Sequence, residues 1–144
     1  MSVHMRKRRV AVVDDDPRIR ESLDSLLSAA GYDVELYESG EQILKEEGLG
    51  QIACLVSDVR MPGIDGFQLY RRAVAAYPGL SVILISAHHD RSVREQAIRE
   101  NVFAYFYKPF DGTEFITAVN AAVERSVGPE AKNAASSGEG TGGV

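Results

Sequence analysis

The sequence of 144 residues is poor in cysteine and has no long hydrophobic segment. Its single cysteine, Cys54, excludes a framework of internal disulfide bonds and suits a reducing compartment. Every apolar run is far shorter than the ~20 residues of a membrane span, and no signal-peptide pattern opens the chain. We therefore expect a cytoplasmic protein that does not enter a membrane.

Several motifs of catalytic and metal sites are also absent: the chain has no Walker-type phosphate loop, no CxxC pair and no HExxH. A GxGxxG pattern occurs at 138–143, but it follows no predicted strand and opens no predicted helix, so we assign it no dinucleotide. The net charge of −5 argues against direct binding of nucleic acid by the whole chain. The one basic run, at 6–9, leads straight into a predicted strand and is interpreted as a solvated lead-in.

What the sequence does contain is a regular alternation of short apolar runs with segments of helical spacing. The apolar runs predict strands at 10–13, 34–37, 52–56, 81–85 and 102–107. Cap residues predict the helix starts that follow them, at Asp16, Ser39, Asp65, Asp90 and Asp111. Five strands that alternate with five helices predict an α/β protein with a parallel sheet and helices on both faces.

Some local details of the helices are also predicted. Ser39 with Gln42, and Asp111 with Glu114, fit the capping-box pattern. In the fourth helix, Val93, Ala97 and Ile98 are expected to form a thin apolar face.

Domain boundaries follow from composition. We expect an N-terminal lead-in over residues 1–8 and one folded domain over 9–126. Residues 127–144 are rich in Ala, Ser and Gly and lose all periodicity, which predicts a flexible tail or an interdomain linker.

Charged and polar residues stand where the predicted strands end. Asp14 and Asp15 follow the first strand, Asp58 ends the third, and Ser86 and Lys108 follow the fourth and fifth. In open parallel sheets, ligands bind outside these carboxyl ends. Carboxylates brought together there require protonation or a cation, and oxygen ligands suit Mg²⁺.

This arrangement predicts phosphoryl chemistry. The cation, the Lys108 ammonium and the Ser86 hydroxyl would together neutralise the oxygens of a phosphoryl group. Asp58 is the candidate nucleophile, because a turn-rich loop at 59–66 follows it and leaves access. Asp16 is assigned to the helix cap instead, since Pro17 follows it.

Four segments carry a resemblance to a known family: VVDDDP at 12–17, DVRMPGIDG at 58–66, ISA at 85–87 and YKPF at 107–110. In these segments the chain resembles the response-regulator receiver domains of two-component signalling, over residues 8–126. The resemblance implies a flavodoxin-like, doubly wound sheet with strand order 2-1-3-4-5. It also implies that Asp58 accepts a phosphoryl group from a histidine kinase or a phosphotransfer protein.

The resemblance further implies a role for each site residue. Asp15, Asp58 and the backbone carbonyl of Arg60 would bind Mg²⁺ (or Mn²⁺), with Asp14 acting through water. Ser86 and Lys108 would contact the phosphoryl oxygens. Tyr105 matches the family's switching aromatic, which turns inward when Ser86 moves toward the phosphoryl group. Arg60 and His88 occupy positions at which such domains modulate attack by water.

As a receiver, the chain would act as a switch and catalyse only its own phosphorylation and dephosphorylation. The switched surface would be that of the fourth helix, fifth strand and fifth helix. Its partners would be a downstream protein, an output domain missing from this sequence, or a second copy bound through that surface. The sequence leaves open whether the chain stands alone or is part of a larger regulator.

Two alternatives remain open at this point. A phosphatase of the haloacid-dehalogenase type uses a D-x-D nucleophile motif, which Asp14-x-Asp16 matches formally, although Asp16 is predicted to cap a helix. A pseudo-receiver would act as an interaction module without phosphorylation. Every residue required for phosphorylation is nevertheless present.

Overall fold

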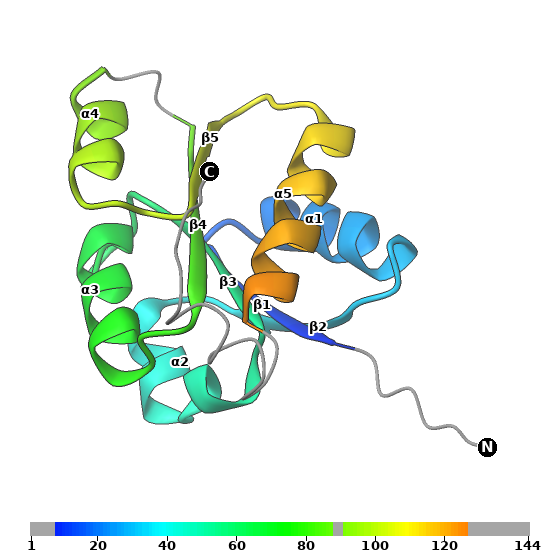
Figure 1. Cartoon of the computed structure of the whole chain (residues 1–144), viewed down its shortest axis with the longest axis horizontal. Helices are drawn as coiled ribbons and strands as arrows, with labels where there is room; N and C mark the ends of the chain where they lie inside the picture. The colour runs from blue at the N-terminus through cyan, green and yellow to red at the C-terminus, as the bar shows by residue number, and fades with distance from the viewer. Residues whose placement is uncertain (1–7, 88–90, 127–144) are drawn as a thin grey trace.

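The computed structural model describes residues 8–87 and 91–126, which form a five-stranded parallel sheet with helices on both faces (Figure 1). The strands are β1 (Arg9–Val13), β2 (Asp33–Tyr37), β3 (Cys54–Asp58), β4 (Ser81–Ser86) and β5 (Ala104–Tyr107). Their order in the sheet is β2-β1-β3-β4-β5, and every neighbouring pair is parallel. The predicted flavodoxin-like topology is therefore confirmed. Residues 1–7 of the predicted lead-in and the predicted tail at 127–144 lie outside the described residues.

Five α-helices connect the strands. They are α1 (Pro17–Ala29), α2 (Gly40–Lys45), α3 (Gly66–Ala76), α4 (Arg91–Arg99) and α5 (Gly112–Arg125). A short 3₁₀ helix, η1 (Gly48–Gln51), was not predicted, because its four residues contain two glycines and show no apolar period. Helices α1 and α5 cover one face of the sheet, and α2, α3 and α4 cover the other (Figure 1).

The sheet separates two hydrophobic cores. Alternate residues of one strand point to opposite faces, so Val10 and Val12 of β1 pack with α1 and α5, while Ala11 and Val13 pack with α2, α3 and α4. Because both faces are buried, the central strands read as continuous apolar runs. Since apolar side chains cover both faces of the central strands, polar groups of these strands can reach solvent at the strand ends.

The starts of α1, α2, α3 and α5 agree with the predicted caps, with two differences in detail, whereas Asp90, the predicted cap of α4, lies outside the described residues. Asp16 accepts a hydrogen bond from the backbone N–H of Arg18, and Asp65 forms a complete capping box with Gln68. Ser39 accepts from the N–H of Gln42, but the Gln42 side chain accepts from the backbone of Glu38, one residue before the expected partner. The Asp111 side chain accepts a hydrogen bond from the backbone N–H of Thr113, two residues on, and not from that of Glu114, as the predicted capping box would require. These caps fix where α1, α2, α3 and α5 begin.

The predicted apolar face of α4 is wrong at one residue. Val93 and Ala97 are buried, but Ile98 is 66% exposed. Each residue advances an α-helix by about 100°, so Ile98 is turned away from the buried side that Ala97 faces. The burial of Gln96 and Glu100 is intermediate, and these polar residues complete the inner side of α4.

No helix within 8–87 and 91–126 is long and apolar enough to cross a membrane.

Candidate functional site at the carboxyl edge of the sheet

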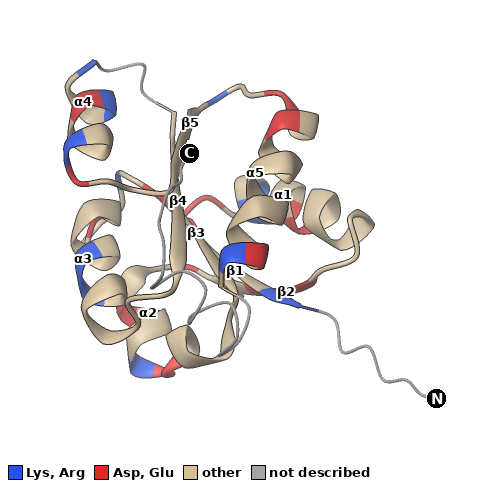
Figure 2. Cartoon of the chain, in the orientation of Figure 1, with Lys and Arg blue, Asp and Glu red and all other residues tan. Residues whose placement is uncertain are grey.

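Three carboxylates meet where the strand order reverses between β1 and β3. Asp14 and Asp15 directly follow β1, in the acidic connection to α1 (Figure 2), and Asp58 is the last residue of β3. Val13 pairs with Ser57, which brings the two strand ends level. One oxygen from each of the three carboxylates lies within 4.8 Å of the others. The reversal point is where ligands bind in open α/β sheets.

The three carboxylates differ in burial. Asp14 is fully buried and Asp58 is 8% exposed, whereas Asp15 is open to solvent. Burial raises the pKa of Asp58 to about 6, and the negative charge of Asp14 adds to this effect, while Lys108 opposes it. Burial also raises the pKa of Asp14, against the hydrogen bond from the Asp16 backbone and the charge of Lys108. The positive charge nearby is thus too small to offset two buried carboxylates.

Asp14 is held by bonds on every side. Its Oδ1 accepts from the backbone N–H of Asp16 at 2.9 Å, and its Oδ2 lies 3.4 Å from the Nζ of Lys108. Its own backbone N–H donates to Tyr37 of β2, and its carbonyl accepts from the guanidinium of Arg20 at 2.6 Å. These bonds fix the orientation of Asp14 and leave Asp15 as the solvent-facing carboxylate.

The carboxylate cluster fits a hard divalent cation. Its donors are all oxygen, the two buried members have raised pKa values, and the exposed Asp15 gives an ion access from solvent. Mg²⁺ prefers carboxylates and water as ligands. Asp14, Asp15 and Asp58 are therefore residues that would hold such an ion.

Ser86 and Lys108 lie at the ends of the neighbouring strands. Ser86 is the buried last residue of β4, and its carbonyl accepts from the backbone N–H of Lys108 at 2.8 Å. The Lys108 side chain extends from this point to Asp14. The structure thus brings the lysine to the carboxylates and places Ser86 on the strand adjacent to Asp58.

The loop after Asp58 is anchored at both of its ends. Val59 and Met61 are buried, whereas Arg60 between them is exposed. The backbone N–H of Gly66 donates to the carbonyl of Val59 at 2.8 Å. A Cβ atom on Gly66 would lie 2.4 Å from the carbonyl oxygen of Asp58, so only glycine fits there. This packing fixes the backbone on either side of Arg60.

Tyr105 lies on the same face of the sheet as Ser86. It pairs with Leu84, two residues before Ser86, and it packs against the core beneath α2, α3 and α4. Alternation along β4 places Leu84 and Ser86 on one face. The ring is half-buried at this position. His88, the other predicted modulating residue, lies outside the described residues.

Two contacts near this edge were not anticipated from the sequence. Arg20 of α1 reaches the Asp14 carbonyl, and Glu41 of α2 accepts a hydrogen bond from the backbone N–H of Ile64. Neither residue follows a strand end, which was the pattern used to find the site.

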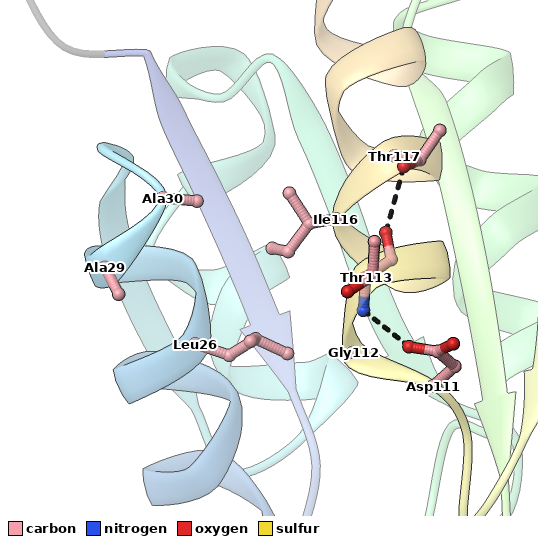
Figure 3. A pocket seen from close by; sticks show the side chains of 8 residues that line it. All are labelled: Leu26, Ala29, Ala30, Asp111, Gly112, Thr113, Ile116 and Thr117. Atoms are coloured by element: carbon pink, nitrogen blue, oxygen red, sulfur yellow. Dashed lines mark hydrogen bonds between the residues drawn. The ribbon is translucent and has the colours of Figure 1, made fainter.

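A separate hollow lies between α1 and α5 (Figure 3). It has a volume of about 480 Å³ and is lined by Leu26, Ala29, Ala30, Asp111, Gly112, Thr113, Ile116 and Thr117. Its polar groups bond within α5, since Thr113 donates its N–H to Asp111 and Thr117 donates to the Thr113 carbonyl. It shares no residue with the carboxylate cluster and is not the reaction site.

Comparison with known proteins gives a consistent result. The family model described as response regulator receiver domain matches residues 10–120. The chain is 32% identical to the transcriptional regulatory protein FixJ of Bradyrhizobium diazoefficiens over 129 residues, covering 90% of this chain and 62% of FixJ. It is 36% identical to the DNA-binding transcriptional regulator NtrC of Escherichia coli K12 over 119 residues, covering 83% of this chain and 25% of NtrC.

A solved structure shows the same fold. The receiver domain protein of Clostridium thermocellum superposes with a TM-score of 0.76 at 27% identity, covering 82% of this chain and 95% of that one. The chain therefore spans nearly all of an isolated domain of this fold, but less than two thirds of FixJ and NtrC.

Proposed function

The chain belongs to the response-regulator receiver domain family, and on that premise we propose that Asp58 accepts a phosphoryl group from a histidine kinase or a phosphotransfer protein. One observation carries the proposal: Asp58 ends a central strand within 4.8 Å of two other carboxylates, with a lysine reaching the same cluster. Asp58 as a whole is 8% exposed, and the turn-rich loop at 59–65 follows it.

In the proposed reaction, a carboxylate oxygen of Asp58 attacks the phosphorus atom, and the bond from phosphorus to the donor's imidazole nitrogen breaks. An acyl phosphate on Asp58 is the product. Mg²⁺ (or Mn²⁺), when bound, supplies positive charge that offsets the phosphoryl oxygens. Asp15, Asp58 and the Arg60 carbonyl would bind this ion directly, and Asp14 would bind it through water.

Lys108 and Ser86 would contact the phosphoryl oxygens on the other side. Lys108 already lies 3.4 Å from Asp14, and its positive charge acts on the pKa of the neighbouring Asp58. Movement of the Ser86 side chain toward that group would open space on the face of the sheet that Tyr105 shares. Tyr105 would then turn inward and change the surface formed by α4, β5 and α5.

Such a domain works by changing partners. We propose that it operates in the cytoplasm and catalyses only its own phosphorylation and dephosphorylation. Arg60 and His88 would set the lifetime of the acyl phosphate. FixJ and NtrC are both described as transcriptional regulators and are longer than this chain, which supports an attached output domain or a separate downstream protein as the partner. A homodimer through α4, β5 and α5 is the third proposed assembly.

Acetyl phosphate, a small phosphoryl donor, tests the phosphorylation proposal. With Mg²⁺ present, intact mass spectrometry should show the addition of one phosphoryl group, and the Asp58→Asn variant should show none. Asp16→Asn is the matched control, because an asparagine can also cap α1, and it should be labelled like the wild type. Repeated hydrolysis that depends on Asp14 and survives Asp58→Asn would instead indicate a phosphatase.

Beryllofluoride, which mimics a bound phosphoryl group, tests the switch. In the presence of Mg²⁺ it should shift the NMR signals of Tyr105 and of residues along α4 and β5. The Asp58→Asn variant should show no such shifts. A wild-type spectrum that stays unchanged at Tyr105 while beryllofluoride binds would favour a pseudo-receiver.

A further inference from the structure

The first turn of α2 contacts the loop that follows the acceptor, and we propose that Glu41 is a positioning residue for that loop. Through it, Glu41 would hold the backbone of Arg60 at the metal site. The inference rests on the proposed function, because that function gives the Arg60 carbonyl its role. Glu41 belongs to α2, and it lies outside the carboxylate cluster of Asp14, Asp15 and Asp58.

The central contact is a hydrogen bond between segments that are 23 residues apart. Oε2 of Glu41 accepts from the backbone N–H of Ile64 at 2.8 Å. Hydrogen bonds to a charged acceptor are stronger than those between neutral groups. This one ties the far part of the 59–65 loop to α2, on the face of the sheet that α2 shares with α3.

Two glycines make the close approach possible. Gly63 has φ +77°, and a Cβ atom there would lie 2.2 Å from Oε2 of Glu41. A Cβ atom on Gly40 would lie 3.2 Å from the side chain of Ile64. The Glu41 carboxylate occupies the space beside Gly63, and a side chain at position 40 would press on Ile64, so both glycines favour the close approach of the loop to α2.

The rest of the loop is fixed by other contacts. The buried side chains of Val59 and Met61 anchor its first half, and the Gly66 N–H bonds to the Val59 carbonyl. Pro62 and Gly63 are exposed, so the second half is held by the packing of the Ile64 side chain on the core, the capping box of Asp65 and the bond from Ile64 to Glu41. Loss of that bond should loosen the segment just after Arg60 and Met61, while the sheet and both cores remain intact.

Hydrogen exchange and metal affinity of the full chain test this role without any phosphoryl transfer. In Glu41→Ala, the amide proton of Ile64 should exchange about fivefold to tenfold faster, and the dissociation constant for Mn²⁺, measured by electron paramagnetic resonance, should rise about threefold or more. Glu41→Gln keeps a carbonyl oxygen in the same place and should restore most of both values. The free energy of unfolding should fall in Glu41→Ala by no more than this local change, so that all three proteins stay folded under the conditions of both measurements.

Glu46→Ala is the matched control, because Glu46 is an exposed glutamate at the other end of α2 that bonds to Gln42 and does not reach the loop. It should leave both readouts at the wild-type level. If Glu41→Ala equals Glu46→Ala in Ile64 exchange and in Mn²⁺ affinity, Glu41 is not a positioning residue. A wild type that binds Mn²⁺ but is never labelled at Asp58 would instead refute the proposed function and leave these two readouts to decide the role of Glu41.

Discussion

The ammonium of Lys108 lies 3.4 Å from Oδ2 of Asp14, although the two residues are 94 positions apart in the sequence. Asp14 is fully buried, and the Lys108 side chain is 17% exposed. This is a charge pair at the base of a site that also contains Asp15 and Asp58. Among the described residues, one ammonium therefore faces three carboxylates, which leaves an excess of negative charge at the site.

Removal of the Lys108 charge should destabilise the metal-free protein. Lys108→Met keeps the alkyl chain but leaves the buried Asp14 carboxylate without its cation, at a cost of about 2–4 kcal/mol in the free energy of unfolding at pH 7.5. Urea denaturation in the presence of a chelator measures this. Lys45→Met, at an exposed lysine in the last turn of α2, should change stability by less than about 0.5 kcal/mol. Equal effects of the two substitutions would contradict the charge pairing.

Replacement of Asp58 should have an effect on stability that depends on pH. A carboxyl group that ionises near pH 3.9 in an unfolded chain keeps its proton up to about pH 6 in the folded protein. Between these values the folded state binds more protons, so the free energy of unfolding falls as the pH rises from about 4 to 6. This stability is present at low pH and lost above the folded pKa.

The Asp58→Asn variant carries no ionisable group at this position and avoids that loss. Without metal, its free energy of unfolding should exceed that of the wild type by about 1–3 kcal/mol at pH 7.5. At pH 5, where most wild-type Asp58 is protonated, the difference should be much smaller. Urea unfolding at the two pH values measures the difference. The same gain at both values would show that the ionisation of Asp58 costs the folded state little.

Mg²⁺ should stabilise the protein at pH 7.5 through the exposed Asp15. At ten times the dissociation constant, an ion that binds only the folded state adds about 1.4 kcal/mol, which raises the melting temperature by a few degrees. Asp15→Asn should abolish this increase, while the neighbouring Asp16→Asn, which retains an N-cap side chain, should keep it. Thermal denaturation with and without Mg²⁺ distinguishes them. An increase that persists in Asp15→Asn would place the ion elsewhere.

The orientation of α4 can be tested through two apolar residues five positions apart. Val93→Ala removes methyl groups from a buried position and should cost about 1–3 kcal/mol. Ile98→Ala changes a side chain that is 66% exposed and should cost less than about 0.5 kcal/mol. Chemical denaturation at a protein concentration that keeps the chain monomeric compares the two. A larger cost at Ile98 would mean that α4 packs with a different face inward.

Ile98 also shows where prediction from the sequence ended. The strand order of the sheet was implied by the resemblance to receiver domains. The parallel sheet itself followed from the alternation of strands and helices, and the positions of Asp14, Asp58 and Lys108 followed from strand ends that meet at one edge. Those inferences depend only on period and order along the chain. The rotation of a short polar helix does not follow from period and order, because a thin apolar stripe is not enough to fix it. It depends on contacts such as the ion pair between Glu100 and Arg71 of α3 and the hydrogen bond that Gln96 donates to Glu100.

Hydrogen bonds between a side chain and distant backbone atoms likewise could not be predicted from the sequence. The bonds from Arg20 to the Asp14 carbonyl and from the Ile64 N–H to Glu41 join a side chain to main-chain atoms of a distant loop. A carbonyl or amide is present at every residue, so the sequence carries no signal for which one is chosen. Only the packed arrangement of α1, α2 and the loop determines it.

The chemical location of the phosphoryl group tests most directly whether Asp58 is the acceptor. After incubation with acetyl phosphate and Mg²⁺, borohydride reduces an aspartyl phosphate to homoserine, and peptide mass spectrometry then identifies the converted position. If Asp58 is the acceptor, homoserine should appear at position 58 alone, with Asp14 and Asp15 unchanged. Conversion at position 14 or 15 with Asp58 unmodified, or stable phosphorylation that resists borohydride, would contradict it.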